Sequence, residues 1–152
     1  MGHRLTLGFT EWQCVTSFDG DVPTAVTLEV QLGSLHVIEG VGGLKPLGGV
    51  EKKMVHDSAL KTLKVKDHPV ARWTSTSVTA NGDGYDLMGS LAINGQEHPC
   101  PVRVTVAGEK VTGAASVVQT TWGVKPYSQM MGTLQVSDLV EALVEVTVPP
   151  QP

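Results

Sequence analysis

The chain has 152 residues, which is the size of a single domain, and 41% of them are hydrophobic, enough for a core of its own. A net charge of −4 with only three arginines argues against nucleic acid and against a strongly anionic membrane surface as partners. No stretch reaches the length of a membrane span and no apolar run follows a basic start. We therefore expect a cytoplasmic protein without a signal peptide or an integral membrane segment.

The beginning of the chain is expected to form strands, because apolar and polar residues alternate there. Leu5, Leu7 and Phe9 are in one phase, and the phase then shifts at Trp12, which predicts a bulge or sharp bend near Thr10–Glu11. After a turn at 19–23 comes the clearest half-buried strand. Its apolar positions are Val26, Leu28, Val30 and Leu32.

One region differs from this pattern. Five glycines and a proline between Gly40 and Gly49 predict a loop. From Val50 to Leu63 the apolar residues follow a helical spacing, which predicts a short helix that ends before Pro69.

Five further strands are expected at about 70–80, 85–94, 99–107, 111–120 and 138–148, separated by short turns. The Asn81-Gly82-Asp83-Gly84 and Asn94-Gly95 sequences are strong hairpin signals, because a type I′ turn needs a positive φ at both central positions. A chain of hairpins protects its edges best by closing into a barrel. The sequence therefore predicts one antiparallel β-barrel domain over 1–149, with a proline-rich tail at 150–152.

No residue pattern predicts catalysis or a bound metal, and we expect no enzyme activity and no cofactor. The five histidines have no metal-ligand spacing, and His56 and Asp57, as neighbours in a helix, should point apart. No serine has the context of a nucleophile elbow. Cys14 and Cys100 are expected to be reduced thiols rather than a disulfide.

A barrel of this size either fills its interior with side chains or encloses one ligand. Arg72 and Arg103 are out of phase with the inward positions and should face water. The candidate cavity lining is apolar and aromatic, and alternation places its first six members on the inward face: Leu28, Val30, Trp73, Leu87, Leu91 and Val104, with Met54, Trp122 and Tyr127 added. If Trp12, Trp73 and Trp122 instead meet at the centre, they fill the barrel, and it would serve as a structural or protein-interaction module.

Several local motifs, in their order and spacing, resemble the YceI-like family of lipocalin-like polyisoprenoid-binding proteins, in the branch common among actinobacteria. They span nearly the whole chain: Gly2-His3-Arg4-Leu5, Ser34-Leu35-His36-Val37, Gly42-Gly43-Leu44-Lys45-Pro46-Leu47, His68-Pro69-Val70-Ala71-Arg72-Trp73, Gly89-Ser90-Leu91-Ala92-Ile93-Asn94-Gly95, Thr121-Trp122-Gly123-Val124-Lys125-Pro126-Tyr127 and Leu134-Gln135-Val136-Ser137-Asp138.

The resemblance implies an extended antiparallel barrel with a short helix, which holds a long isoprenoid or similar lipid in its interior and has no catalytic residue. Family members carry another strand before the Gly-His motif, and here Met1 directly precedes it. Either the first strand of the family is lacking or Met1 is an internal start, and in this sequence we expect an edge of the sheet to be left open. An unpaired edge is a template for another chain, so we also expect a symmetric homodimer.

Overall fold

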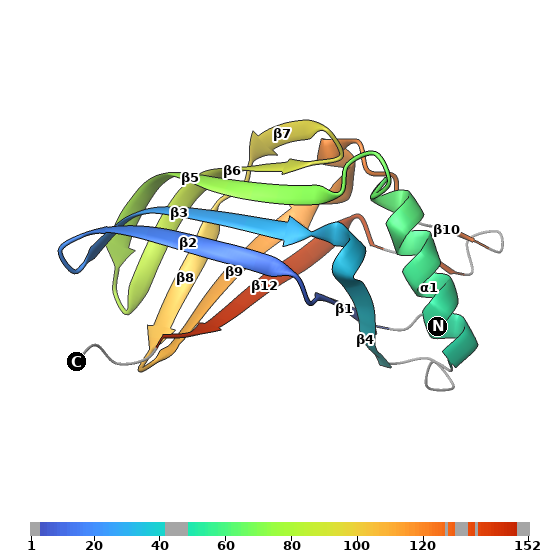
Figure 1. Cartoon of the computed structure of the whole chain (residues 1–152), viewed down its shortest axis with the longest axis horizontal. Coiled ribbons are helices and arrows are strands. Elements are labelled where there is room, and N and C mark those ends of the chain that lie inside the picture. The colour runs from blue at the N-terminus through green and yellow to red at the C-terminus, as the bar shows by residue number, and fades with distance from the viewer. Residues whose placement is uncertain (1–3, 42–48, 127, 130–133, 136, 149–152) are drawn as a thin grey trace.

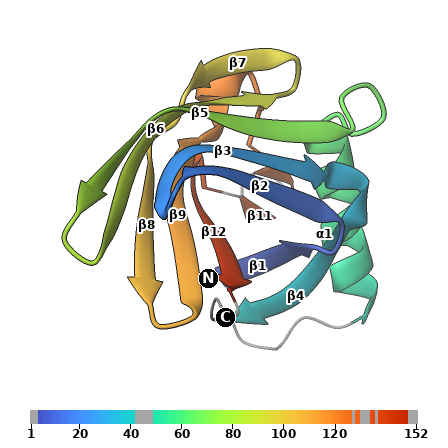
Figure 2. The ribbon, with the colours of Figure 1, turned by 60° about the vertical axis from the view of Figure 1, so that its left-hand side comes forward.

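The computed structural model describes residues 4–41, 49–126, 128–129, 134–135 and 137–148. Its strands form a strongly curled antiparallel sheet, a half-barrel with one helix at its end (Figures 1 and 2). The helix is α1 (Gly49–Thr62), and two single 3₁₀ turns are η1 (Leu32–Ser34) and η2 (Gln119–Trp122). The strands are β1 (Arg4–Phe9), β2 (Trp12–Asp19), β3 (Val22–Gln31), β4 (Leu35–Val41), β5 (Val70–Asn81), β6 (Gly84–Ile93), β7 (Gln96–Pro99), β8 (Val102–Ala107), β9 (Lys110–Val118), β10 (Ser128–Gln129), β11 (Leu134–Gln135) and β12 (Leu139–Thr147).

The main sheet has the strand order β12-β9-β8-β6-β5-β3-β2, and β7 pairs with β6 beside this path. Strands β1 and β4 pair with each other, as do the short strands β10 and β11. Among the described residues, β12 pairs only with β9 and β2 only with β3, so these two strands are the edges of the sheet. The prediction of a mainly antiparallel, lipocalin-like sheet with one helix is confirmed. The sheet curls into a half-barrel, in which the edge strands β2 and β12 are not paired with each other.

The phase shift near Thr10–Glu11 marks a bend, as expected. Strand β1 ends at Phe9 and β2 begins at Trp12, and the two strands lie in different sheets. The Gln31 amide donates to the Glu11 carbonyl oxygen at 2.9 Å, and the Thr10 amide donates to Ser34 at 3.4 Å. The β2–β3 ribbon therefore turns at this point and continues as the β1–β4 pair.

The predicted hairpins are present. Gly82-Asp83 joins β5 to β6, with Asn81 as the last residue of β5 and a positive φ of 61° at Gly82, so this turn differs from the expected Asn-Gly type I′ turn. Asn94-Gly95 joins β6 to β7 as expected. Asn94 and Gly95 have φ values of 54° and 71°, the left-handed conformation that a type I′ turn requires. The helix predicted at 50–63 is observed at 49–62. The predicted loop between Gly40 and Gly49 and the tail at 150–152 lie wholly or largely outside the described residues.

Several strands differ from the expectation. The single strand predicted at 99–107 is divided into β7 and β8, which pair with different parts of β6. The break falls at Cys100–Pro101, because Pro101 has no N–H to donate to a sheet ladder. Strands β4, β10 and β11 were not predicted, and they form because β4 pairs with β1 and β10 pairs with β11.

Candidate ligand-binding face

The hydrophobic core lies on one face of the curled sheet, which we call the concave face. Leu28 on β3, Trp73 on β5 and Leu91 on β6 stand directly opposite one another in the ladder. Residues that oppose each other in an antiparallel pair share a face, so these three side chains are neighbours. The buried core of the chain includes Trp73, Leu87, Cys100, Val117, Trp122 and Val124, with Leu28, Leu91 and Val104 packed against it.

Two tryptophans fix one part of this face. The indole Nε1 of Trp73 donates to the Cys100 carbonyl oxygen at 2.8 Å, and that of Trp122 donates to the Leu91 carbonyl oxygen at 2.7 Å. The Asn94 side-chain amide donates to the Trp122 carbonyl oxygen at 3.0 Å, and the His98 ring lies edge-on to Trp122 with centroids 5.5 Å apart. Both indoles are thus buried with their polar atoms satisfied. They form a rigid floor made by β5 and η2.

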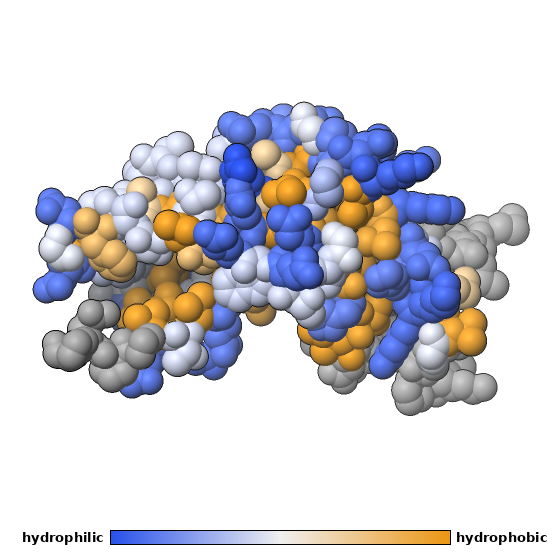
Figure 3. Space-filling view, viewed as in Figure 1, coloured by the Kyte–Doolittle hydropathy of each residue, from blue (hydrophilic) through white to orange (hydrophobic). Residues whose placement is uncertain are grey.

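The rest of the concave face is apolar but incompletely covered. Trp12 opposes Val30, Val106 is two residues from Val104, and Val140 opposes the buried Val117. Trp12 is nevertheless 42% exposed, Val106 36% and Val140 38%. Figure 3 shows the molecule as an arch hollowed on its lower side, with hydrophobic side chains at the rim of the hollow. Apolar surface is therefore open to solvent on the same face as the core.

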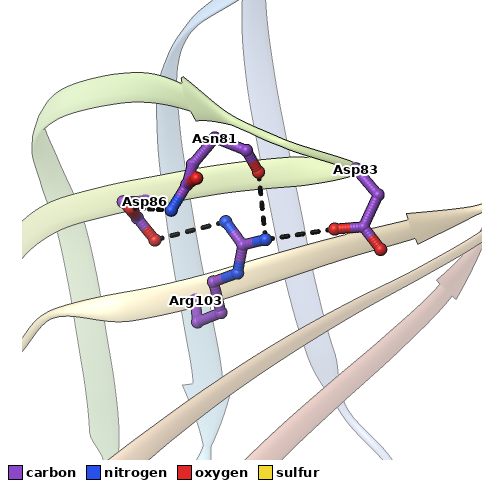
Figure 4. A network of polar contacts seen from close by, with 4 residues as sticks. All are labelled: Asn81, Asp83, Asp86 and Arg103. Carbon is purple, nitrogen blue, oxygen red and sulfur yellow. Dashed lines mark hydrogen bonds and ion pairs between the residues drawn. The ribbon is translucent and has the colours of Figure 1, made fainter.

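The opposite, convex face carries charged pairs together with exposed apolar side chains such as Met88 and Leu143. Arg72 pairs with Glu29 across β5 and β3. Arg103 contacts Asp86 and Asp83, each at 3.2 Å, and donates to the Asn81 carbonyl oxygen at 3.0 Å (Figure 4). Both arginines face away from the concave face, as their phase indicated.

The concave face gathers most of the predicted lining. Leu28, Val30, Trp73, Leu87, Leu91 and Val104 lie on it, and Trp122 covers part of it from η2. The structure does not bring Met54 to this face, because its helix turns that side chain toward solvent. Tyr127 lies outside the described residues. Of the three tryptophans whose meeting would fill the barrel, Trp73 and Trp122 share one cluster and Trp12 is separate.

Sequence reasoning did not select Cys100, Val117 and Val124, which are buried in the same core. Alternation along the predicted strand 111–120 could have found Val117, which is in phase with Val111. Cys100 and Val124 lie in irregular segments with no period, so no local pattern marks them.

The described residues offer little for acid–base or metal chemistry. None of their buried side chains is polar or charged, and they contain no group of three His, Cys, Asp or Glu residues able to hold a metal ion. His56 and Asp57 do not point apart as expected, because their side chains meet at 3.1 Å on the surface of α1. The His56 contact, with Lys53 beside it, lowers the pKa of the exposed Asp57 carboxyl.

The two cysteines are free thiols, Cys14 exposed on β2 and Cys100 buried. Burial by neighbouring atoms raises the pKa of both thiols. A shallow, open depression of about 270 Å³ lies at the bend between β1 and β2, and its lining is mostly polar: Thr10, Glu11, Trp12, Gln13, Glu29 and Gln31. Among the helices of the described part of the chain, none has the length and apolar character needed to cross a membrane.

Comparison with known proteins finds one family and a set of related folds. The chain is 37% identical over 54 residues to a UPF0312 protein of Pectobacterium atrosepticum, and 38% identical over 47 residues to one of Pseudomonas aeruginosa. These alignments cover 36% and 31% of this chain but only 28% and 25% of the relatives. The chain thus matches about a quarter of the length of these curated relatives.

Among solved structures, the YCEI protein of Campylobacter jejuni superposes with a TM-score of 0.67 at 13% identity, covering 98% of this chain and 86% of that one. BcnA of Burkholderia cenocepacia superposes with a TM-score of 0.62 at 20% identity, covering 91% and 84%. At these identities the likeness shows the fold alone. The model of the YceI-like domain matches residues 2–148, and the chain therefore belongs to the YceI-like domain family.

Proposed function

We propose that this protein binds a hydrophobic, polyisoprenoid-like ligand non-covalently on its concave face and carries it without chemical change. The observation that supports this most is the open apolar surface beside the core, where Trp12, Val106 and Val140 remain exposed. A long hydrocarbon laid over these side chains would gain about 0.8 kcal/mol for each buried CH₂ group. Such a ligand needs few polar contacts, and the charged pairs of Arg72 and Arg103 lie on the convex face.

The cavity lining proposed for this ligand is the set Leu28, Val30, Leu87, Leu91 and Val104, with Trp73 and Trp122 as its floor. The two free cysteines support a reducing, cytoplasmic setting for this activity. A membership in the YceI-like family is consistent with hydrophobic ligand binding, and the isoprenoid character of the ligand is the finer part of the proposal.

A second candidate function is a structural or protein-interaction module that works as a homodimer. The unpaired edges of β2 and β12 favour it, because an edge strand without proline or lysine is open to pairing with a second copy. Two-fold pairing would satisfy identical edges mutually. The two functions are compatible if dimerisation closes the half-barrel around the ligand.

The direct test places an arginine on each face of the same strand. Leu91→Arg puts a charge on the concave face, where an unpaired charge is costly, and should abolish uptake of a fluorescent isoprenoid analogue. Met88→Arg is the matched control, because Met88 is exposed on the convex side of β6. Mass spectrometry of lipids that co-purify with the native protein would identify the natural ligand.

Circular dichroism should first establish that both variants are folded. The proposal requires binding to be lost in Leu91→Arg and kept in Met88→Arg. Equal binding by both folded variants would mean that the concave face is not the binding site. If the native protein binds no hydrophobic probe at all, the interaction module becomes the better description.

A further inference from the structure

Helix α1 presents one face that is not used by the core. Val50, Lys53, Met54, Asp57 and Lys61 recur at spacings of three and four residues, so they share one side of the helix. All five are exposed, and Val50 is 75% and Met54 45% accessible. The helix packs against β4, and Leu63 just beyond its end contacts the core. The exposed side therefore combines apolar and basic side chains.

Lysines are concentrated in this part of the chain. Five of the eight lysines lie between 52 and 66, although the whole chain carries a net charge of −4. Lys64 and Lys66, in the turn that follows α1, are exposed beside the helix. Asp57 is the one carboxylate in the sequence between 52 and 66, and it is paired with Lys53 at 3.1 Å; Glu51 and Asp67 flank the segment. Lys61, Lys64 and Lys66 thus concentrate positive charge at the end of α1 and in the turn after it.

We propose that the exposed side of α1 (Val50, Lys53, Met54, Asp57 and Lys61) and the turn after it (Lys64 and Lys66), together called the α1 face, dock on the surface of an anionic lipid bilayer. Basic side chains are attracted to anionic headgroups, and apolar side chains on the same helix face insert at the headgroup boundary. The chain-wide charge argued against an anionic membrane surface, but five of the eight lysines are concentrated between 52 and 66. The apolar residues between the lysines favour a lipid surface over an acidic protein.

Docking through α1 would bring the proposed ligand-binding face to the membrane, an argument that rests on the proposed function. The helix flanks the end of the arch beside β4 (Figures 1 and 2). A protein docked through this helix would hold its concave face close to the membrane. A hydrophobic chain could then move between bilayer and protein without crossing much water, where its apolar surface is costly.

Flotation with vesicles tests the docking. The probes are vesicles of phosphatidylcholine alone and of phosphatidylcholine mixed with phosphatidylserine, each at low and high salt. The native protein should bind the mixed vesicles at low salt and be released by high salt. Lys61→Glu/Lys64→Glu should lower the partition coefficient by about tenfold or more, since each lysine contributes attraction at the surface. Val50→Asp/Met54→Asp should also weaken binding.

The matched control is Lys110→Glu/Lys125→Glu, which changes the net charge equally at exposed lysines outside the α1 face. It should bind mixed vesicles within about twofold of the native protein. An equal loss in the control and the α1 variant, or no binding by the native protein at low salt, would overturn the proposal. Isoprenoid uptake measured without vesicles should be unchanged in the α1 variants. Failure of uptake alone would refute the ligand proposal and leave the docking intact.

Discussion

Gly89 lies beneath the indole ring of Trp73, and replacing it with alanine tests how rigidly the floor of the concave face is packed. A Cβ atom at position 89 would lie 2.5 Å from Cε2 of Trp73 and 2.8 Å from the Thr74 carbonyl oxygen. The ring cannot move aside freely, because its Nε1 is bonded to the Cys100 carbonyl oxygen. Alanine at this position must therefore displace either the indole or the strand.

The expected cost follows from overpacking a dense core, which is about 1–3 kcal/mol for an added methyl-sized group. For a domain of this length each kcal/mol lowers the melting temperature by roughly 2–4 °C. The loss of stability caused by Gly89→Ala should therefore be measurable by thermal or urea unfolding. It should also weaken ligand binding, since the displaced indole is part of the proposed floor.

A double-mutant cycle with Trp73→Leu identifies the cause. If the indole is what the new methyl group meets, Gly89→Ala should cost less in the Trp73→Leu background, by at least about 0.5 kcal/mol. The contact with the Thr74 carbonyl oxygen remains, so the relief should be incomplete. Circular dichroism during urea unfolding measures all four proteins without relying on tryptophan emission. An equal cost in both backgrounds would refute the account of Trp73 as a fixed floor.

Three further predictions concern the rest of the molecule. In the folded protein a thiol reagent should label the exposed Cys14 and not the buried Cys100, and simultaneous labelling of both would contradict the structure. Because the pKa of the Cys14 thiol is raised, its labelling should be slower than that of a free cysteine and should become faster as the pH rises. Arg103→Met should destabilise the protein by about 1 kcal/mol at low salt and by less at high salt, because its pairs with Asp86 and Asp83 are partly screened; urea unfolding at two salt concentrations tests this. If the native protein sediments as a dimer, Leu143→Lys on the free edge of β12 should shift it to monomer, and a native monomer at all concentrations would remove the basis for edge pairing.

The sequence by itself determined the features that depend on neighbouring residues. Alternation located the main strands, and Asn94-Gly95 located a turn, because pleating and left-handed backbone conformations are local properties. The phase shift before Trp12 located the bend between β1 and β2 for the same reason. Alternation also identified the face shared by Leu28, Trp73 and Leu91.

Tertiary structure decided the features that depend on partners distant in sequence. Strand β4 formed because β1 pairs with it. The strand predicted at 99–107 is divided at Pro101, which has no N–H to donate, and its two parts pair with different stretches of β6. Met54 does not belong to the lining, because the packing of α1 against β4 fixes which side of the helix faces solvent. Tertiary structure also set how far the sheet curls. The twist between neighbouring strands accumulates over every strand pair from β2 to β12, and this sum fixes how far apart the two edges lie.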